Sequence, residues 1–289
     1  MRYRLIQWIE PWVGEALAPV LIPDQPALST IGGGLAVLIA MAWSRRDGLI
    51  WWKALLAGGA GALCGPAGGR LLWALTEWRF VWEHPIALVH PYQGGAVSFG
   101  ALVGAVFGAM AALALLKAPR WSYADVLGPP ALLGIAFARI GCVMRSCDFG
   151  SPTSLPWSIR HSSASRIWRI HVQEGLIEPT SGLTAPIHPF PLYLAVWGAA
   201  CLALVWWRPQ VFGGAPGQRA TGVGALWCVG RFLIEFTRHP GDAPPLVGPL
   251  NYGHGFALAS FVVLLLLNRW LGAHPQEVDA AEEGSALEV

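Results

Sequence analysis

Residues 94–116 read GGAVSFGALVGAVFGAMAALALL and contain no charged side chain. A hydrocarbon core about 30 Å thick needs roughly 20 apolar residues for one helical crossing, so this stretch is long enough to cross a bilayer as a helix. The whole chain has a similar character, because 54% of its 289 residues are hydrophobic and 12% are charged. Soluble domains carry roughly 25% charged residues. So few charges could not cover the surface of a soluble globule, and lipid is the expected solvent for much of the chain.

Apolar windows recur along the chain and predict an all-α membrane protein with about seven transmembrane helices. The fourth and sixth windows carry charges, and a strict hydropathy threshold would miss both. We expect residues 1–270 to form a single polytopic membrane domain. The windows are Leu28–Trp43, Trp52–Leu75, Gly94–Leu116, Tyr123–Met144, Ile187–Trp207, Gly222–Phe236 and Tyr252–Leu267.

The positions of Arg and Lys predict the orientation, because cytoplasmic loops are enriched in these residues. Basic residues follow the first, third, fifth and seventh windows, which places these four segments on the cytoplasmic side. The N-terminus is then outside and the C-terminus is cytoplasmic. An extracytoplasmic loop is expected over about residues 145–186, and residues 271–289 are expected to be an acidic, disordered cytoplasmic tail.

Charge and cysteine content exclude several classes of function. A net charge of +2 is too small to predict a nucleic-acid partner. The five cysteines form no CxxC motif and there is no His-x-x-x-His pattern, so we expect neither a metal nor a cofactor. Cys142 and Cys147 lie on the predicted outer side, where they could form a disulfide or remain free thiols.

Four arginines lie within or at the edges of the predicted spans, where each needs a partner or water. Glu235 stands four residues after Arg231 and three before Arg238, so it can pair with one or both on a helix. Arg139 and Arg70 are left without obvious partners. An excess of guanidinium groups at membrane depth favours binding of a phosphate near the outer leaflet, and structural pairing or snorkelling is the alternative.

Glycines around the third window allow two interpretations. Gly94 and Gly95 precede the window at its outer end, where a helix N-terminus offers N–H groups to an anion. Gly100, Gly104 and Gly108 are spaced by four, which is typical of closely packed helices in lipid.

Four stretches together resemble the prolipoprotein diacylglyceryl transferases, a family of seven-span enzymes of the bacterial inner membrane. The resemblance covers about residues 60–260, and Arg70 also has a family counterpart. The stretches are the glycine run 94–104, the segment 134–150, HPFPLY at 188–193 and GRFLIEFTR at 230–238.

The resemblance implies transfer of the sn-1,2-diacylglyceryl group from phosphatidylglycerol to the lipobox cysteine of prolipoproteins, with release of glycerol 1-phosphate. The implied partners are phosphatidylglycerol, prolipoprotein signal peptides and membrane lipids. Arg139 would bind the lipid phosphate, and Arg231 would assist it or the leaving group. Glu235 and Arg238 would orient that pair.

The other site residues also follow from the resemblance. Gly150 would shape the loop over the pocket, and His188 with Tyr193 would build a wall at the fifth span. His188 is in addition a candidate catalytic base. Further candidates for substrate binding are Arg70, Gly94, Gly95, Gly100 and Gly104.

The chain departs from the family at several positions expected to activate the thiol. Phe99 stands where the family carries a histidine, and Cys142 and Arg145 replace asparagines. The family's glutamate falls on Cys147, and the adjacent Asp148 could replace it. The family's N-terminal tyrosine has no clear equivalent.

These departures leave three interpretations open. His188 or His254 could act as the base through water. The chain could instead be an altered member that binds anionic phospholipid as an accessory or uses another acceptor. A solute transporter is weakly supported, because no polar axis crosses both leaflets.

Overall fold

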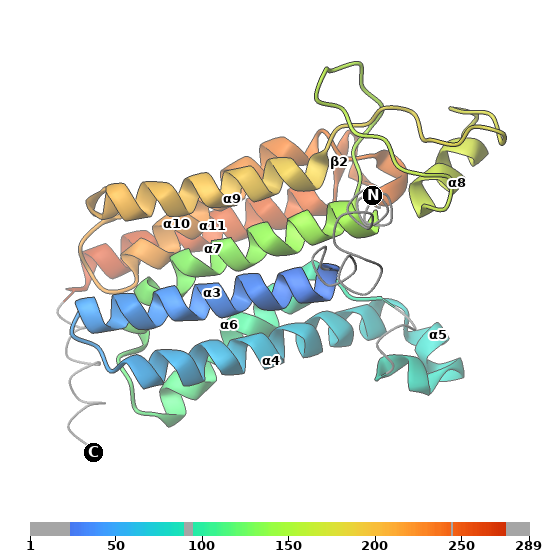
Figure 1. Ribbon diagram of the computed structural model, residues 1–289. Helices are drawn as coiled ribbons and strands as arrows, with labels where there is room; N and C mark the ends of the chain where they lie inside the picture. The colour runs from blue at the N-terminus through green and yellow to red at the C-terminus, as the bar shows by residue number, and fades with distance from the viewer. Residues whose placement is uncertain (1–23, 90–94, 244, 276–289) are drawn as a thin grey trace, which may run out of the picture. The chain divides into compact units, whose positions relative to one another are not determined.

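The computed structural model describes residues 24–89, 95–243 and 245–275, and most of these residues are helical (Figure 1). Each predicted window coincides with a long helix. The predicted tail from residue 276 onward and Gly94 lie outside the described residues. The long helices are α3 (Gln25–Arg46), α4 (Trp51–Thr76), α6 (Ser98–Leu115), α7 (Arg120–Arg145), α9 (Phe190–Trp207), α10 (Gln218–Glu235) and α11 (Tyr252–Ala273).

Five of these helices, α3, α6, α7, α9 and α11, are long and apolar enough to cross a membrane. The expectation that the fourth window would fall below a hydropathy threshold was wrong, because α7 qualifies over its 26 residues. α10 does not qualify; Arg219, Arg231 and Glu235 lie within its 18 residues. The protein is thus a helical one with several apolar helices of membrane-spanning length.

The described part of the chain divides into two compact units, and the first contains residues 24–36, 128–214, 218–243 and 245–273. Within it, α10 packs against both α9 and α11. Small residues allow this packing: a side chain on Gly230 would overlap the indole of Trp197, and one on Gly198 would approach the Leu132 carbonyl of α7. Figure 1 shows α7, α9, α10 and α11 running alongside one another in this unit.

Of the described residues, the second unit contains 37–89, 95–127, 215–217 and 274–275. In this unit α4 packs on α6, and glycines on both helices allow the two backbones to come into direct contact. A Cβ on Gly108 would lie 2.8 Å from the Ala60 carbonyl oxygen, and one on Gly104 would lie 3.1 Å from the Cα of Gly68. The short helices α5 (Trp78–Glu83) and η1 (Pro85–Leu88) follow α4.

A structured loop joins α7 to α9 in the first unit. It contains α8 (Arg166–Gln173) and a small apolar core of Phe149, Ile167 and Ile187. Isolated β-bridges tie it together, including one between Gly150 and Arg238. Other short elements are η2 (Pro209–Phe212), η3 (Pro240–Asp242) and an antiparallel pair of β1 (Pro245–Val247) and β2 (Leu250–Asn251).

The end of α7 turns the chain sharply into this loop. The Cys147 N–H donates to the Cys142 carbonyl at 3.2 Å, and Ser146 adopts a positive φ of 59°. This is the pattern of a Schellman cap, in which the residue in the left-handed conformation is usually glycine. The Ser146 hydroxyl lies 2.6 Å from Nδ1 of His161, which holds the turn in place. Both cysteines are free thiols, so the disulfide alternative is not realised.

Candidate functional site

Arg231 and Glu235 form a buried ion pair on α10. They are separated by one helical turn, and their exposed fractions are 5% and 1%. Glu235 also accepts a hydrogen bond of 3.3 Å from Arg238, just beyond the helix end. The expectation that Glu235 pairs with one or both arginines is confirmed, because i, i+3 and i, i+4 positions share a helix face.

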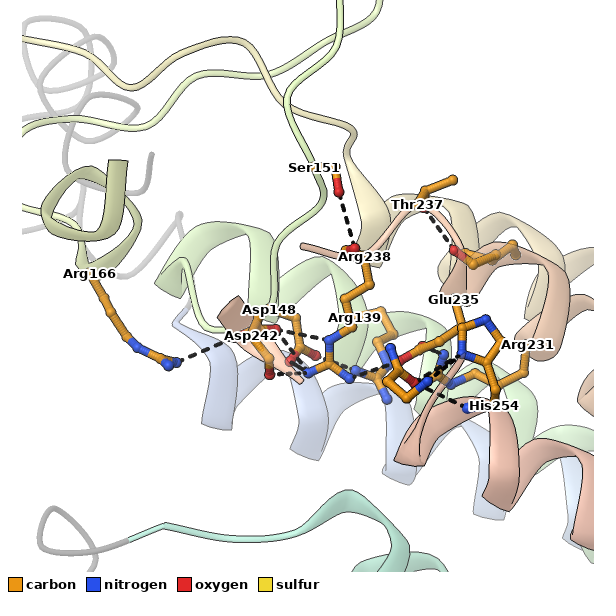
Figure 2. Close-up of polar contacts among 12 residues, drawn as sticks. Arg139, Asp148, Ser151, Arg166, Arg231, Glu235, Thr237, Arg238, Asp242 and His254 are labelled. Atoms are coloured by element: carbon orange, nitrogen blue, oxygen red, sulfur yellow. Dashed lines mark hydrogen bonds and ion pairs between the residues drawn. The ribbon is translucent and has the colours of Figure 1, made fainter. Parts of the chain in front are cut away.

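Arg238 links this pair to the loop after α7. Its guanidinium donates to Asp148 at 3.2 Å and approaches Asp242 to 2.8 Å. Asp148 in turn pairs with Arg139 of α7. Figure 2 shows these side chains converging from α7, α10 and the loops that follow them. We call the set Arg139, Arg231, Arg238, Asp148, Glu235 and Asp242 the arginine cluster.

The arginine cluster is balanced in charge, with three guanidinium groups and three carboxylates. A fourth arginine, Arg166, approaches Asp242 to 3.4 Å, but its side chain is 56% exposed and therefore at the rim. The expectation that Arg139 lacks a partner was wrong, because Asp148 lies beyond the helix end and only the turn at Ser146 brings it back. An incoming phosphate would therefore have to exchange with a carboxylate.

Asp242 lies in η3 and, like Asp148, is outside the long helices. Burial raises the pKa of its carboxyl, and the nearby Arg238 guanidinium opposes that rise. Sequence reasoning missed this residue, because nothing in the segment after α10 indicates that η3 returns toward Arg238.

An aromatic ring lies beneath two of the arginines. The guanidinium carbons of Arg231 and Arg238 lie 5.5 and 5.4 Å from the ring centroid of Phe190, the first residue of α9. The negative face of the ring attracts both cations, while their N–H groups pair with the carboxylates of the cluster. Sequence reasoning missed Phe190 as well, although it stands between the histidine and tyrosine of the HPFPLY stretch.

Gly150 is where the loop passes closest to the rest of the site. A Cβ there would lie 2.5 Å from the His188 carbonyl oxygen and 2.8 Å from the Thr237 carbonyl oxygen. Only glycine allows this approach, and the Ser151 N–H then donates to the Thr237 carbonyl at 2.9 Å. Gly150 thus fixes Asp148, two residues earlier, relative to Arg238.

His188 and Tyr193 contact each other rather than the arginines. Nδ1 of His188 lies 3.2 Å from the Tyr193 hydroxyl, which also accepts a hydrogen bond from the Trp157 indole at 2.8 Å. These contacts connect α9 to the loop; the role of the two residues as a wall of the pocket stays a prediction. A catalytic role for His188 stays a prediction. His254 of α11, in contrast, lies beside Arg231 and Glu235 (Figure 2).

Arg70 belongs to the second unit, and its guanidinium binds backbone carbonyls there. It donates to Ala87, Leu88 and Gly95 at 2.8, 3.0 and 3.0 Å. These bonds tie the segment after α4 to the start of the third window. Gly95 packs against the Trp73 indole, and a Cβ on Gly95 would lie 2.9 Å from that ring. These contacts match the structural interpretation of Arg70; substrate binding by Arg70 and Gly95 stays a prediction.

Gly100 and Gly104 face α4 across the packed seam of the second unit. Side chains on them would overlap the carbonyls of Gly68 and Cys64. This supports the packing interpretation, and their role in substrate binding remains untested. Phe99 occupies the second position of α6.

The geometry suits recognition of a planar or tetrahedral oxyanion in a dry environment. Guanidinium groups bind phosphate bidentately, and low exposure strengthens each charge-assisted hydrogen bond. Among residues 24–89, 95–243 and 245–275, no group of histidine, cysteine and acidic residues could hold a metal ion.

Comparison with known proteins identifies the family. The sequence model described as prolipoprotein diacylglyceryl transferase matches residues 27–270. A relative from Trichormus variabilis, named phosphatidylglycerol–prolipoprotein diacylglyceryl transferase, is 27% identical over 209 residues, which cover 70% of this chain and 68% of the relative. A second from Clostridium perfringens, with the same name and the number 2, is 27% identical over 218 residues, covering 73% and 77%. A third, from Bordetella avium, is 28% identical over 206 residues, covering 69% and 70%. The chain therefore belongs to the prolipoprotein diacylglyceryl transferase family.

Proposed function

We propose that this chain transfers the sn-1,2-diacylglyceryl group from phosphatidylglycerol to the lipobox cysteine of prolipoproteins. The observation that carries the proposal is the arginine cluster, in a chain whose family match spans residues 27–270. The relatives are named for this donor and this acceptor.

The proposed reaction takes place at the glycerol carbon that joins the diacylglyceryl group to the phosphate. A bond from this carbon to the acceptor sulfur replaces its bond to a phosphate oxygen. The acceptor thiol loses its proton, the sulfur attacks that carbon, and the bond from carbon to phosphate oxygen breaks. Negative charge then grows on the leaving glycerol 1-phosphate. Arg139 and Arg231 are placed to stabilise that charge, and Glu235 with Arg238 orient them.

The same proposal includes a topology. All seven long helices cross the bacterial inner membrane, the N-terminus lies outside and the acidic tail lies in the cytoplasm. The arginine cluster then lies toward the outer leaflet, because Arg139 is near the end of α7 that leads into the loop between α7 and α9. Arg238, just after α10, is tied to the same loop through Asp148 and Gly150. The signal peptide of a prolipoprotein would reach the cluster from the membrane.

The proposal is tested with purified full-length protein, phosphatidylglycerol vesicles and a synthetic lipobox peptide. Wild-type protein is expected to raise the peptide mass by one diacylglyceryl group. Arg139→Gln is expected to abolish this transfer, whereas Arg169→Gln, at an exposed position of α8, is expected to leave it intact. Full transfer by Arg139→Gln would disprove the phosphate role of Arg139. Binding of the lipid without transfer by the wild type would support an accessory function instead.

A further inference from the structure

The imidazole of His254 is buried beside the arginine cluster. It lies in the first turn of α11 with 1% of its surface exposed. The ring packs against two phenylalanines, with centroids 5.1 Å from Phe232 of α10 and 4.3 Å from Phe236, which directly follows that helix. Phe232 and Phe236 directly follow Arg231 and Glu235 in the chain, so the packing holds the ring next to that ion pair (Figure 2).

One nitrogen of this ring is used in the cap of α11. The backbone N–H of Asn251 donates to Nδ1 of His254 at 3.2 Å. The Asn251 side-chain oxygen accepts the backbone N–H of His254 at 3.2 Å and lies 3.1 Å from Nδ1. This reciprocal arrangement is a capping box with histidine in place of the usual glutamate. The backbone N–H of Asn251 requires Nδ1 as an acceptor, whereas the Asn251 side-chain oxygen could only accept a hydrogen bond from Nδ1. We assign Nδ1 as the acceptor, because that oxygen already accepts the backbone N–H of His254, and the proton of the neutral ring then resides on Nε2.

The other nitrogen, Nε2, is buried without a hydrogen-bond partner. Buried donors in native proteins are almost always paired, so an unpaired one calls for an explanation. The ring nitrogens of His171 are also unpaired, but His171 lies in α8 of the loop. His254 lies instead beside Arg231 and Glu235 of the arginine cluster (Figure 2).

The surroundings of Nε2 favour a negatively charged oxygen. A side chain on Gly253 would overlap the Glu235 carboxylate, so the first turn of α11 lies directly against the cluster. The N-terminus of a helix carries a partial positive charge, and α11 has 22 residues. Arg231 adds a full positive charge on the adjacent helix. A phosphate oxygen there would meet a guanidinium, a helix N-terminus and an imidazole N–H.

We propose that Nε2–H of His254 donates a hydrogen bond to a phosphate oxygen of the lipid headgroup bound beside Arg231. This inference rests on the proposed function for the identity of the lipid, and it adds a binding residue that neither the arginines nor the family motifs supply. The hydrogen bond from the neutral imidazole orients the phosphate oxygen and leaves the net charge of the arginine cluster unchanged. It also makes His254 a donor in the resting enzyme rather than the base that accepts the thiol proton.

The test compares three substitutions with different hydrogen-bonding atoms. His254→Leu removes both nitrogens, His254→Asn keeps a polar atom near the position of Nδ1, and His254→Gln places an amide N–H near the position of Nε2. His274→Leu, directly after the far end of α11, is the matched control. Binding of dioleoyl-phosphatidylglycerol, glycerol 1-phosphate and diacylglycerol to the purified full-length proteins is measured by native mass spectrometry, and thermal unfolding verifies the fold.

His254→Leu and His254→Asn are expected to weaken phosphatidylglycerol binding about tenfold, the effect of one hydrogen bond to a charged group. His254→Gln and His274→Leu are expected to bind like the wild type. Diacylglycerol, which lacks the phosphate, is expected to bind all variants equally, and a parallel loss for glycerol 1-phosphate would identify the product as a second ligand of the same donor.

Wild-type affinity in His254→Leu would overturn the inference, as would a folded His254→Gln that fails to restore binding. These outcomes are separable from failure of the proposed function. If the wild type binds phosphatidylglycerol through His254 but transfers nothing to the lipobox peptide, the transferase proposal fails and the inference stands.

Discussion

Arg238 donates a hydrogen bond of 3.2 Å to Asp148, a residue 90 positions earlier in the chain. Asp148 also pairs with Arg139, so one carboxylate bridges a guanidinium group of α7 and one from the segment just after α10. A carboxylate and a phosphate present the same kind of oxygen to a guanidinium. A lipid phosphate that binds as proposed would therefore compete with Asp148 for these two arginines.

Asp148→Asn is predicted to lower the unfolding free energy of the lipid-free protein. It is also predicted to increase the stabilisation that added phosphatidylglycerol provides. Loss of the carboxylate removes two charge-assisted bonds at partly buried side chains, which costs about 2 kcal/mol of unfolding free energy. Added phosphatidylglycerol should restore more stability than in the wild type, because its phosphate meets no competing carboxylate. Thermal unfolding with and without phosphatidylglycerol measures both effects. Glu178→Gln, at an exposed loop position, serves as the control. An equal lipid response in Asp148→Asn and the wild type would refute the competition.

Glu235 is predicted to matter more for stability than its partner Arg231. Removing Glu235 leaves the buried Arg231 without its carboxylate, whereas removing Arg231 leaves Glu235 paired with Arg238 at 3.3 Å. An uncompensated buried charge costs about 3–5 kcal/mol. Glu235→Met should approach that cost, Arg231→Met should cost less, and the double variant should cost less than the sum. Chemical unfolding in detergent measures the three values, and strict additivity would contradict the pairing.

Gly150→Ala is predicted to impair both the loop and the transfer reaction. The added methyl group would lie 2.5 Å from the His188 carbonyl oxygen, and backbone on both sides cannot yield easily. Asp148 would then move away from Arg238. Gly182→Ala is the matched control, because a Cβ at Gly182 in the same loop has no neighbour within 4 Å. Transfer to the lipobox peptide and the unfolding temperature should both fall in Gly150→Ala and stay unchanged in Gly182→Ala. Equal effects of the two substitutions would remove any special role for Gly150.

The long helices could be predicted from sequence because their signal is local. Each window is a run of apolar residues, and its helix follows from the need to satisfy backbone groups within the segment. The expected hydropathy was wrong for α7, where charged and apolar residues mix. This helix is more apolar overall than its charged residues Asp125 and Arg139 suggested.

Half of the arginine cluster could be predicted for the same reason. Arg231, Glu235 and Arg238 share one helix face, and spacing alone shows that they can pair. Asp148 and Asp242 reach the cluster only through turns of the chain, one of which depends on a serine in a conformation that usually selects glycine. Phe190 was missed because an aromatic residue in an apolar helix carries no signal that distinguishes packing from a contact with arginine.

Gly104→Ala is predicted to destabilise the protein through helix packing alone. The new methyl group would overlap the Cys64 carbonyl and lie 3.1 Å from the Cα of Gly68, forcing α4 and α6 apart. Alanine ordinarily favours a helix over glycine by roughly 1 kcal/mol, so Gly59→Ala, with open space around it, should be neutral or stabilising. If packing is the whole role, transfer per folded molecule should be unchanged in Gly104→Ala. A folded variant with a raised KM for phosphatidylglycerol would instead support substrate binding by this glycine.

The loop between α7 and α9 is predicted to lose stability in mild acid through His161. Burial of this imidazole, 2% exposed, lowers its pKa from 6.5 to about 4. Between these values the unfolded chain binds a proton that the folded chain excludes, so stability is fully present above pH 6.5 and falls as the pH drops toward 4. The difference corresponds to about 3 kcal/mol. His171 acts in the same direction because burial also lowers its pKa, while the raised pKa of Asp242 acts in the opposite direction.

His161→Asn isolates the contribution of this one histidine, because asparagine does not titrate and keeps a polar atom near the Ser146 hydroxyl. The variant should be less stable than the wild type at pH 7.5, since it packs less well. This difference in stability should narrow as the pH falls from 6.5 to 4. The contributions of His171 and Asp242 are present in both proteins and cancel in the comparison. Limited proteolysis of the loop over this pH range measures the opening, with His84→Asn in the second unit as the control. A difference that stays constant with pH would show that the proton bound by His161 is not what opens the loop.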